Sequence, residues 1–212
     1  MKKKSIFKRI FYRLKSIPYL NSLKRGITKK DFTIVCNDCC GGVIYHRIGK
    51  KFFSPFINLF ITHDDFITLL SDFDYYMNEQ LIEDHSESSY PIGLLGSVKI
   101  HFLHYNNFQE AKESWERRKK RIVYDRFLIL LNLTNTLDID YVNKYIDKLE
   151  KLNFKDYIIL SRFESSNSNV IKIDFSDLKE FKNAQVLAPE KYPFRLHIDQ
   201  MNYRECFKRF DI

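Results

Sequence analysis

The 212-residue chain is 44% hydrophobic and 29% charged, which is typical of a globular protein that buries its own core. Its longest apolar runs, such as residues 127–131, are far shorter than the roughly eighteen residues of a membrane-spanning helix, so no transmembrane segment is predicted. The formal net charge of +8 is concentrated at one end. Eleven of the 35 Lys and Arg residues lie in residues 1–30, which contain no Asp or Glu, so 24 basic residues face 27 acidic ones in the remainder. A basic stripe across the body would favour nucleic acid as a partner, and this distribution argues against that class.

Residues 1–30 are predicted to form a basic amphipathic N-terminal arm, followed by a single α/β domain over residues 31–212. Apolar side chains recur at helical spacing in the arm with Lys and Arg around them, at Ile6, Phe7, Ile10, Phe11 and Leu14. Pro18 is expected to close this segment. Such a helix is typical of proteins that lie on an anionic membrane surface, so residues 1–20 are predicted to contact one. Charges recur in every turn and leave no apolar core for a secretory signal, so the expected location is cytoplasmic, peripheral at the inner face of the cell membrane.

The sequence after the arm alternates between short apolar runs and amphipathic stretches. Extended runs are predicted at residues 32–36, 54–61, 98–105, 127–131, 157–160 and 170–175, and helices at residues 42–48, 62–81, 107–121 and 138–152. Thr62 and Asp65 form a capping-box-like start for the second helix, and the polar residues 83–91 are predicted to be a surface loop. Apolar strands separated by helices indicate a sheet covered on both faces. The predicted fold is therefore α/β, a three-layer α/β/α sandwich with a mixed, mostly parallel sheet.

The stretch NDCCGGVIYHRIG, residues 37–49, joins the first predicted strand to the first predicted helix. Cys36 and Cys39 have the spacing of a metal or redox pair, but no second Cys-x-x-Cys or paired His completes a zinc site, and Cys36 falls inside the strand. No metal site is predicted. A Gly-Gly turn that opens a helix presents backbone N–H groups and the positive end of the helix dipole to an anion. Gly41 and Gly42 match neither G-x-G-x-x-G nor a Walker loop, so a phosphate site and a tight packing turn both stay open.

Several motifs occur together in a recognisable order. They are NDCCGGVIYHRIG with Asn37, Cys39, Gly41, Gly42 and Tyr45, then SPFINLFI, DDF at residues 64–66, YPIG at residues 90–93, and IHFLHY with EAKESWERRKKRI. Over roughly residues 32–160 they resemble an uncharacterised bacterial family catalogued as domain of unknown function 1919, whose members are often labelled exopolysaccharide or capsular polysaccharide biosynthesis proteins. The resemblance implies a three-layer fold reminiscent of nucleotide-binding or methyltransferase-like proteins. The chain departs from the family's pattern at Cys40, where an aromatic residue is expected, and at residues 132–137, where an acidic, Gly-containing turn is expected.

The candidate site residues come from the corner, from a strand end and from two helices. The expected ligand-binding residues are Asn37, Cys39, Gly41, Gly42, Tyr45, Arg118 and Arg121. Arg118 shares a helix side with an apolar stripe, where a guanidinium suits either a structural ion pair or a phosphate or carboxylate ligand. The expected catalytic residues are His104, which ends a predicted strand, and Asp65, which could act as a general base although the first turn of a helix also favours a carboxylate as a cap. His63 is a weaker candidate for the same work.

These expectations converge on a transferase of bacterial cell-surface polysaccharide biosynthesis. It would move a sugar or substituent from a nucleotide-activated donor to a membrane-linked glycan acceptor, with the arm holding it at the membrane. The alternative is a non-catalytic scaffold of the same machinery, which would explain the missing signature motifs. A nucleic-acid binder that uses the basic arm ranks third. No cofactor follows from the sequence.

Overall fold

The structure is a computed structural model that describes residues 14–152, 154–178, 185–190 and 194–210. Most of the predicted membrane-contacting segment therefore lies outside the described residues. A helix runs through residues 14–24, so Pro18 lies inside it and does not close it as the sequence predicted. The division into an arm and a domain at residue 30 stays a prediction. None of the helices formed by the described residues combines the length and apolar character needed to cross a membrane.

Four parallel strands form the central sheet in the order β1-β5-β6-β7. Their bounds are β1 Thr33–Cys36, β5 Phe127–Asn132, β6 Tyr157–Ser161 and β7 Val170–Lys172. Side chains alternate between the two faces of a strand, and here both faces are apolar. Leu128 and Leu130 belong to the core on one face, whereas Ile129 and Leu131 belong to the core on the other. This doubly buried pattern is what the continuous apolar run in β5 predicted.

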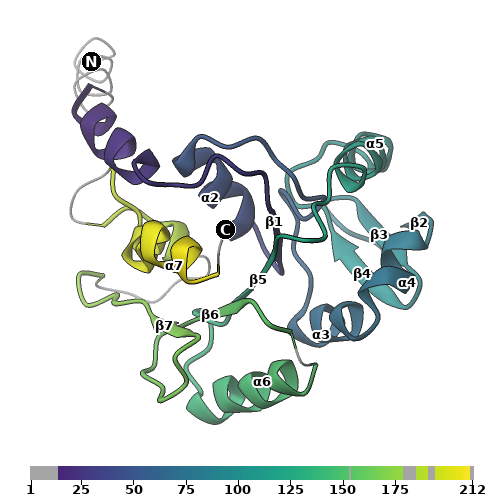
Figure 1. Cartoon of the computed structure of the whole chain (residues 1–212). Coiled ribbons are helices and arrows are strands. Elements are labelled where there is room, and N and C mark those ends of the chain that lie inside the picture. Colours follow the sequence, from purple (N-terminus) through teal and green to yellow (C-terminus); the bar gives the residue numbers. More distant parts are fainter. Residues whose placement is uncertain (1–13, 153, 179–184, 191–193, 211–212) are drawn as a thin grey trace, which may run out of the picture.

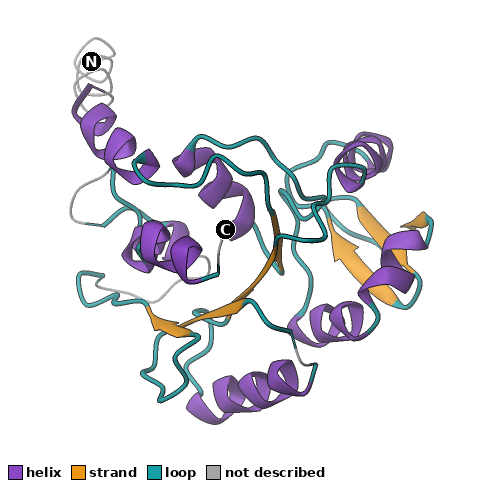
Figure 2. Ribbon diagram, viewed as in Figure 1, coloured by secondary structure: helices purple, strands orange, loops and turns teal. Residues whose placement is uncertain are grey.

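Helices cover both faces of the parallel sheet, as Figures 1 and 2 show. On one face lie α2, Cys40–Ile48, α7, Tyr203–Arg209, and the 3-10 segment His197–Met201. On the other lie α3, His63–Ser71, α4, Phe73–Asn78, and α6, Ile139–Lys151. Another 3-10 turn spans Gln185–Leu187. The predicted α/β sandwich is confirmed.

The antiparallel strands that the predicted mixed sheet included form a second sheet of their own. It contains β2, Leu81–Asp84, β3, Ile92–Leu95, and β4, Val98–His101, in the order β2-β3-β4, with α5, Phe108–Lys119, after it. Gly96 turns the β3-β4 hairpin with φ +58°. The predicted strand 98–105 ends early because the chain turns after Phe102, whose carbonyl accepts from Tyr105 N at 3.2 Å. Part of the predicted loop 83–91 is strand β2.

Residues 54–61 belong to neither sheet, contrary to the predicted strand. The extended run lies alongside β1, which is the edge strand of the parallel sheet. Thr33 Oγ1 donates to Phe53 O at 2.8 Å, and Ile61 N donates to Asn37 O at 2.8 Å. Phe60 forms an isolated bridge with His101 of β4. The run thus covers an exposed strand edge and ties the two sheets together.

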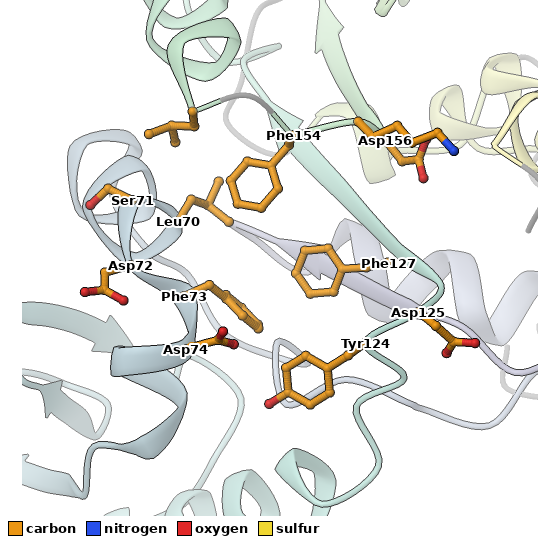
Figure 3. Close-up of a pocket in the computed structure, with 12 residues that line it drawn as sticks. Leu70, Ser71, Asp72, Phe73, Asp74, Tyr124, Asp125, Phe127, Phe154 and Asp156 are labelled. Carbon is orange, nitrogen blue, oxygen red and sulfur yellow. The ribbon is translucent and has the colours of Figure 1, made fainter.

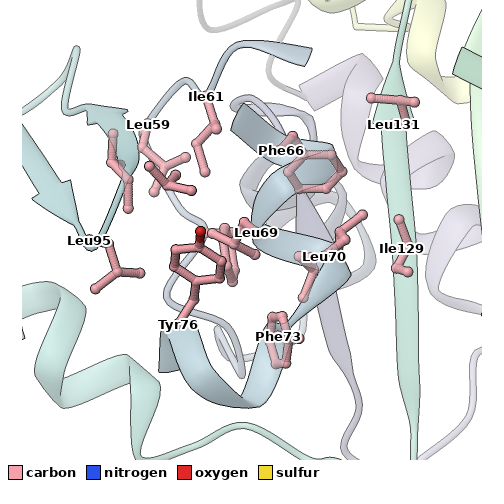
Figure 4. Packing of buried hydrophobic residues seen from close by; sticks show 14 of the residues in the cluster. Leu59, Ile61, Phe66, Leu69, Leu70, Phe73, Tyr76, Leu95, Ile129 and Leu131 are labelled. Atoms are coloured by element: carbon pink, nitrogen blue, oxygen red, sulfur yellow. The ribbon is translucent and has the colours of Figure 1, made fainter. Parts of the chain in front are cut away.

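The predicted helix 62–81 is two helices that meet at Asp72. The Asp72 carboxylate caps α4 by accepting from Tyr75 N at 3.3 Å, while Thr62 caps α3 by accepting from Asp65 N at 3.2 Å, as predicted. Figure 4 shows α3 packed between the sheets, with Leu70 directed toward Ile129 of β5.

Candidate functional site

The strands β1 and β5 end side by side at the carboxyl edge of the parallel sheet, where two asparagines clamp them. Asn37 Oδ1 accepts from Asn132 N at 2.8 Å, and Asn37 Nδ2 donates to Asn132 O at 3.5 Å. Asn37 is only 1% exposed, so its amide is used within the protein. This clamp holds the ends of the two strands at a fixed spacing, at the edge where α/β sheets usually bind ligands.

Asp38 follows the clamp and places a carboxylate at the start of α2. Its Oδ2 accepts from Asn132 Nδ2 at 2.6 Å, and its Oδ1 accepts from Cys40 N at 2.9 Å. A carboxylate is favourable there because it meets the positive end of the helix dipole. Asp38 thus occupies the position in which a phosphate would meet the first turn of α2.

The paired glycines of the corner allow α2 to pack closely on its neighbours. A Cβ at Gly41 would lie 3.0 Å from Cys36 Cβ, and one at Gly42 would lie 3.3 Å from Ile57 Cγ2. Tyr45 is fully buried, and its hydroxyl donates to Phe32 O and accepts from Ile34 N, both at 2.8 Å. These contacts explain the residue types without a ligand, and the ligand-binding role of these three residues stays a prediction.

His63, the first residue of α3, reaches the clamp from the opposite face of the sheet. Its Nε2 lies 3.2 Å from Asn132 O, and its Nδ1 lies 2.7 Å from the Tyr141 hydroxyl. A carbonyl oxygen can only accept, so Nε2 carries the hydrogen and Nδ1 accepts from Tyr141. Burial lowers the pKa of His63, which keeps the imidazole neutral at neutral pH and leaves a lone pair on Nδ1 that can accept a proton.

The contacts of His63 continue along α3 and α6. The Tyr141 and Tyr145 ring centroids lie 4.7 Å apart, and the His63 and Tyr145 centroids 5.4 Å apart. Lys148 Nζ donates to Asp64 Oδ1 at 2.5 Å, and this hydrogen bond lowers the pKa of Asp64. The imidazole is held in one orientation by Tyr141 and Tyr145 of α6 and by Asn132 at the end of β5.

The remaining predicted residues lie in other surroundings. His104 is exposed in the turn after β4, and within the described residues it forms no hydrogen bond or ion pair. Asp65 accepts from the Thr62 hydroxyl at 3.0 Å as part of the cap of α3. Arg118 Nη1 donates to the Tyr105 hydroxyl at 2.5 Å, and its guanidinium lies 5.5 Å from the centre of the Phe52 ring. Arg121 follows the end of α5.

The thiols of the corner are held in their protonated form. Cys39 Sγ donates to Leu59 O at 3.6 Å, and burial raises the pKa of this thiol to about 12. Burial also raises the pKa of Cys36 and Cys40. A protonated thiol is a poor nucleophile and a poor metal ligand. In the described ranges no group of three or more His, Cys, Asp or Glu residues could hold a metal ion.

A cleft of about 520 Å³ opens at the other, amino edge of the sheet, where β5 begins (Figure 3). Its lining combines aromatic rings with four carboxylates and one lysine: Phe73, Tyr124, Phe127, Phe154, Asp72, Asp74, Asp125, Asp156 and Lys155. Carboxylates in this number repel a phosphorylated ligand, whereas rings and carboxylates together suit an uncharged or cationic one. This cleft is a poor place for a nucleotide-activated donor.

Sequence reasoning found only part of the polar cluster at the carboxyl edge, which consists of Asp38, His63, Asn132 and Tyr141. It placed Asn37 and Cys39 beside this cluster and ranked His63 low, but it did not select Asp38, Asn132 or Tyr141 as site residues. Two signals were present: Asp38 directly follows an apolar strand, and Asn132 begins the stretch that departs from the family's pattern. The polar side chains of parallel strand ends meet at one edge, so these signals predict proximity.

Comparison with known proteins agrees with the resemblance seen in the motifs. The family model described as "Domain of unknown function (DUF1919)" matches residues 8–205. An uncharacterized protein of Haemophilus influenzae is 35% identical over 141 residues, which cover 66% of this chain and 66% of that protein. The chain thus spans slightly less than two thirds of that relative's length.

Proposed function

This chain belongs to the family of domain of unknown function DUF1919, and we propose that it is a transferase in bacterial cell-surface polysaccharide biosynthesis, of the exopolysaccharide or capsule type. The family's labels supply the polysaccharide context. The observation that carries the reaction class is the neutral His63 imidazole, hydrogen-bonded to the half-buried Tyr141 at the carboxyl edge of the sheet. A basic group at that edge can activate a hydroxyl of an acceptor glycan.

The proposed step moves one proton in each of two hydrogen bonds. The acceptor hydroxyl gives its proton to the Tyr141 oxygen while Tyr141 gives its own to His63 Nδ1. The acceptor oxygen then forms a bond to the transferred group, and the bond from that group to the donor phosphate breaks with its electrons on the phosphate. Asn132 O, which accepts from Nε2, stabilises the resulting imidazolium, and the nearby Asp38 carboxylate does the same. Tyr141 is the catalytic residue, and His63 acts through it.

Ligand binding tests the first half of the proposal. The full chain should show a raised unfolding temperature with at least one nucleotide sugar, nucleotide or S-adenosylmethionine, because a ligand that binds only the folded state stabilises it. If none of these compounds shifts the transition, the transferase proposal fails.

Removing the Tyr141 hydroxyl tests the proposed proton transfer. Tyr141→Phe removes only the proposed proton acceptor, and Tyr75→Phe, at an exposed tyrosine of α4, is the matched control. In cells that lack the protein, the wild type and Tyr75→Phe should restore surface polysaccharide, and Tyr141→Phe should not. Full restoration by Tyr141→Phe would instead favour the scaffold, in which no proton is transferred.

The arm gives this enzyme its proposed location. A basic amphipathic segment at residues 1–20 would hold the chain at the inner face of the cell membrane, next to a membrane-linked acceptor. The scaffold alternative makes the same use of the arm, so location alone does not separate the two.

A further inference from the structure

A second cleft, of about 580 Å³, lies between residues 19–25, at the end of the first described helix, and the C-terminal segment, residues 195–204. We call it the arm cleft. Its polar lining includes Tyr19, Ser22, Arg25, Arg195, Asn202 and Arg204. It shares no lining residue with the polar cluster at the carboxyl edge, and the proposed transferase step makes no use of it.

The arm cleft carries positive charge without matching negative charge. Arg195 Nε lies 2.9 Å from Glu190 Oε2, in an ion pair that lacks the geometry of a hydrogen bond. Arg25 and Arg204 have no carboxylate partner among the residues that the structure describes. Two guanidinium charges are therefore left to face the same cleft.

Asp199 also lines the arm cleft, but its charge is already matched. Its Oδ2 accepts from the Arg47 guanidinium, from the Tyr19 hydroxyl at 3.0 Å and from Leu196 N at 2.9 Å. Its Oδ1 accepts from the Tyr203 hydroxyl at 2.8 Å. Asp199 thus neutralises the buried Arg47 and leaves the charges of the cleft unmatched.

The guanidinium of Arg204 lies against the backbone of residues 25 and 26. Its Nε donates to Arg25 O at 3.3 Å, and the group lies across Gly26. A Cβ at Gly26 would come within 2.5 Å of Arg204 Nε and 2.7 Å of its Nη2, so a side chain at this position would displace the guanidinium. The left-handed φ of +73° at Gly26 also favours glycine. Arg204 thus lies against the backbone beside Arg25, and both arginines line the same cleft.

We propose that the arm cleft binds a phosphate group, as a monoester or a diphosphate, through Arg25 and Arg204. The planar guanidinium fork forms paired, charge-assisted hydrogen bonds with phosphate oxygens. Phosphate also carries enough negative charge to match two arginines, and the exposed Asn202 side chain adds amide donors. The phosphate can belong to a lipid headgroup or to a soluble compound. A lipid is a candidate because the predicted membrane-contacting segment, residues 1–20, includes Tyr19, which lines the cleft.

Calorimetric titration of the full chain with inorganic phosphate and with pyrophosphate tests the site. Arg25→Gln and Arg204→Gln should each weaken binding about tenfold or more, because each removes a hydrogen bond to a charged group. Arg117→Gln, at an exposed arginine of α5, removes the same charge elsewhere and should leave binding unchanged. Arg204→Lys keeps the charge and loses the fork, so it should bind more weakly than the wild type.

Sedimentation with phosphatidylcholine vesicles that contain either phosphatidic acid or phosphatidylserine separates the two sources. A preference for phosphatidic acid that Arg204→Gln abolishes assigns the site to a lipid phosphate. Binding of pyrophosphate without that preference assigns it to a soluble phosphate. The proposal is overturned if the binding of phosphate, pyrophosphate and vesicles is the same with and without Arg25 and Arg204. It is also overturned if Arg117→Gln weakens binding to the same extent as the substitutions in the cleft.

Discussion

At the scale of single residues, Gly41 and Gly42 are explained by close packing of α2. Ala normally stabilises a helix by about 1 kcal/mol relative to Gly, whereas overpacking a core costs about 1–3 kcal/mol. The Cβ of Gly41→Ala would meet the backbone-proximal Cys36 Cβ at 3.0 Å, which cannot move aside easily. We expect Gly41→Ala to lower the free energy of unfolding by about 1–2 kcal/mol in urea titrations.

Gly42→Ala is the internal comparison, because the nearest atom that its Cβ would meet is the Cγ2 methyl of Ile57, at 3.3 Å. That methyl can give way, so the gain in helix propensity and the packing cost should nearly cancel. Equal losses for the two variants would contradict the packing account of the corner.

His63 makes the stability of the fold depend on pH. Burial lowers its pKa in the folded state, so the unfolded state, with a pKa of about 6.5, binds the proton first as pH falls. Stability should therefore decline from about pH 7 through about pH 6.5 until the lowered folded pKa is reached. His101, whose pKa burial also lowers, contributes with the same sign. The difference between the wild type and His63→Gln isolates His63, and an unchanged slope in the variant would refute this assignment.

At the scale of elements, Asp199 joins the helix of residues 14–24, α2 and the C-terminal segment. Removing one partner of a buried ion pair costs about 3–5 kcal/mol, because the other charge stays buried. Asp199→Asn should therefore destabilise the protein by about that amount in urea unfolding, since it leaves Arg47 unpaired. Tyr19→Phe removes one hydrogen bond and should cost about 1 kcal/mol. Tyr75→Phe should have almost no effect, and a similarly small effect of Asp199→Asn would show that this network does not stabilise the fold.

The same scale shows which elements a single sequence can predict. The strands β1, β5 and β6 and the helices α5 and α6 were predicted because their apolar periods are clear and their caps are local. The break at Asp72 was missed because the helical period continues across it, and the capping of Tyr75 N by the Asp72 side chain decides the break. Strand β2 was missed because two apolar residues followed by two acidic ones, LIED, show no alternation, and the strand is defined by its pairing with β3.

At the scale of the whole molecule, the carboxyl-edge cluster shows why sites are harder to predict than folds. Asp38, His63 and Tyr141 belong to three elements that only the folded chain brings to Asn132. Asn37 was predicted correctly to lie at this edge, yet its amide clamps two strands. The type and order of the residues predict which edge of the sheet a side chain lies at. Only the packing shows which of these side chains are left to contact a ligand.

The N-terminal arm gives a prediction for the whole molecule, because the part of the arm that the structure describes is tied to the body. Tyr19 bonds to Asp199 and Leu23 packs on the core, so deleting residues 1–18 should leave a folded, soluble body, whereas deleting residues 1–26 should destabilise it. Each Lys or Arg near an anionic leaflet contributes about 1 kcal/mol, and stable binding also needs inserted apolar side chains. The shorter deletion should therefore no longer sediment with anionic vesicles, and Phe7→Asp with Phe11→Asp should weaken binding although every basic residue remains. If the shorter deletion unfolds instead, the apolar stripe is part of the core and the membrane interpretation is wrong.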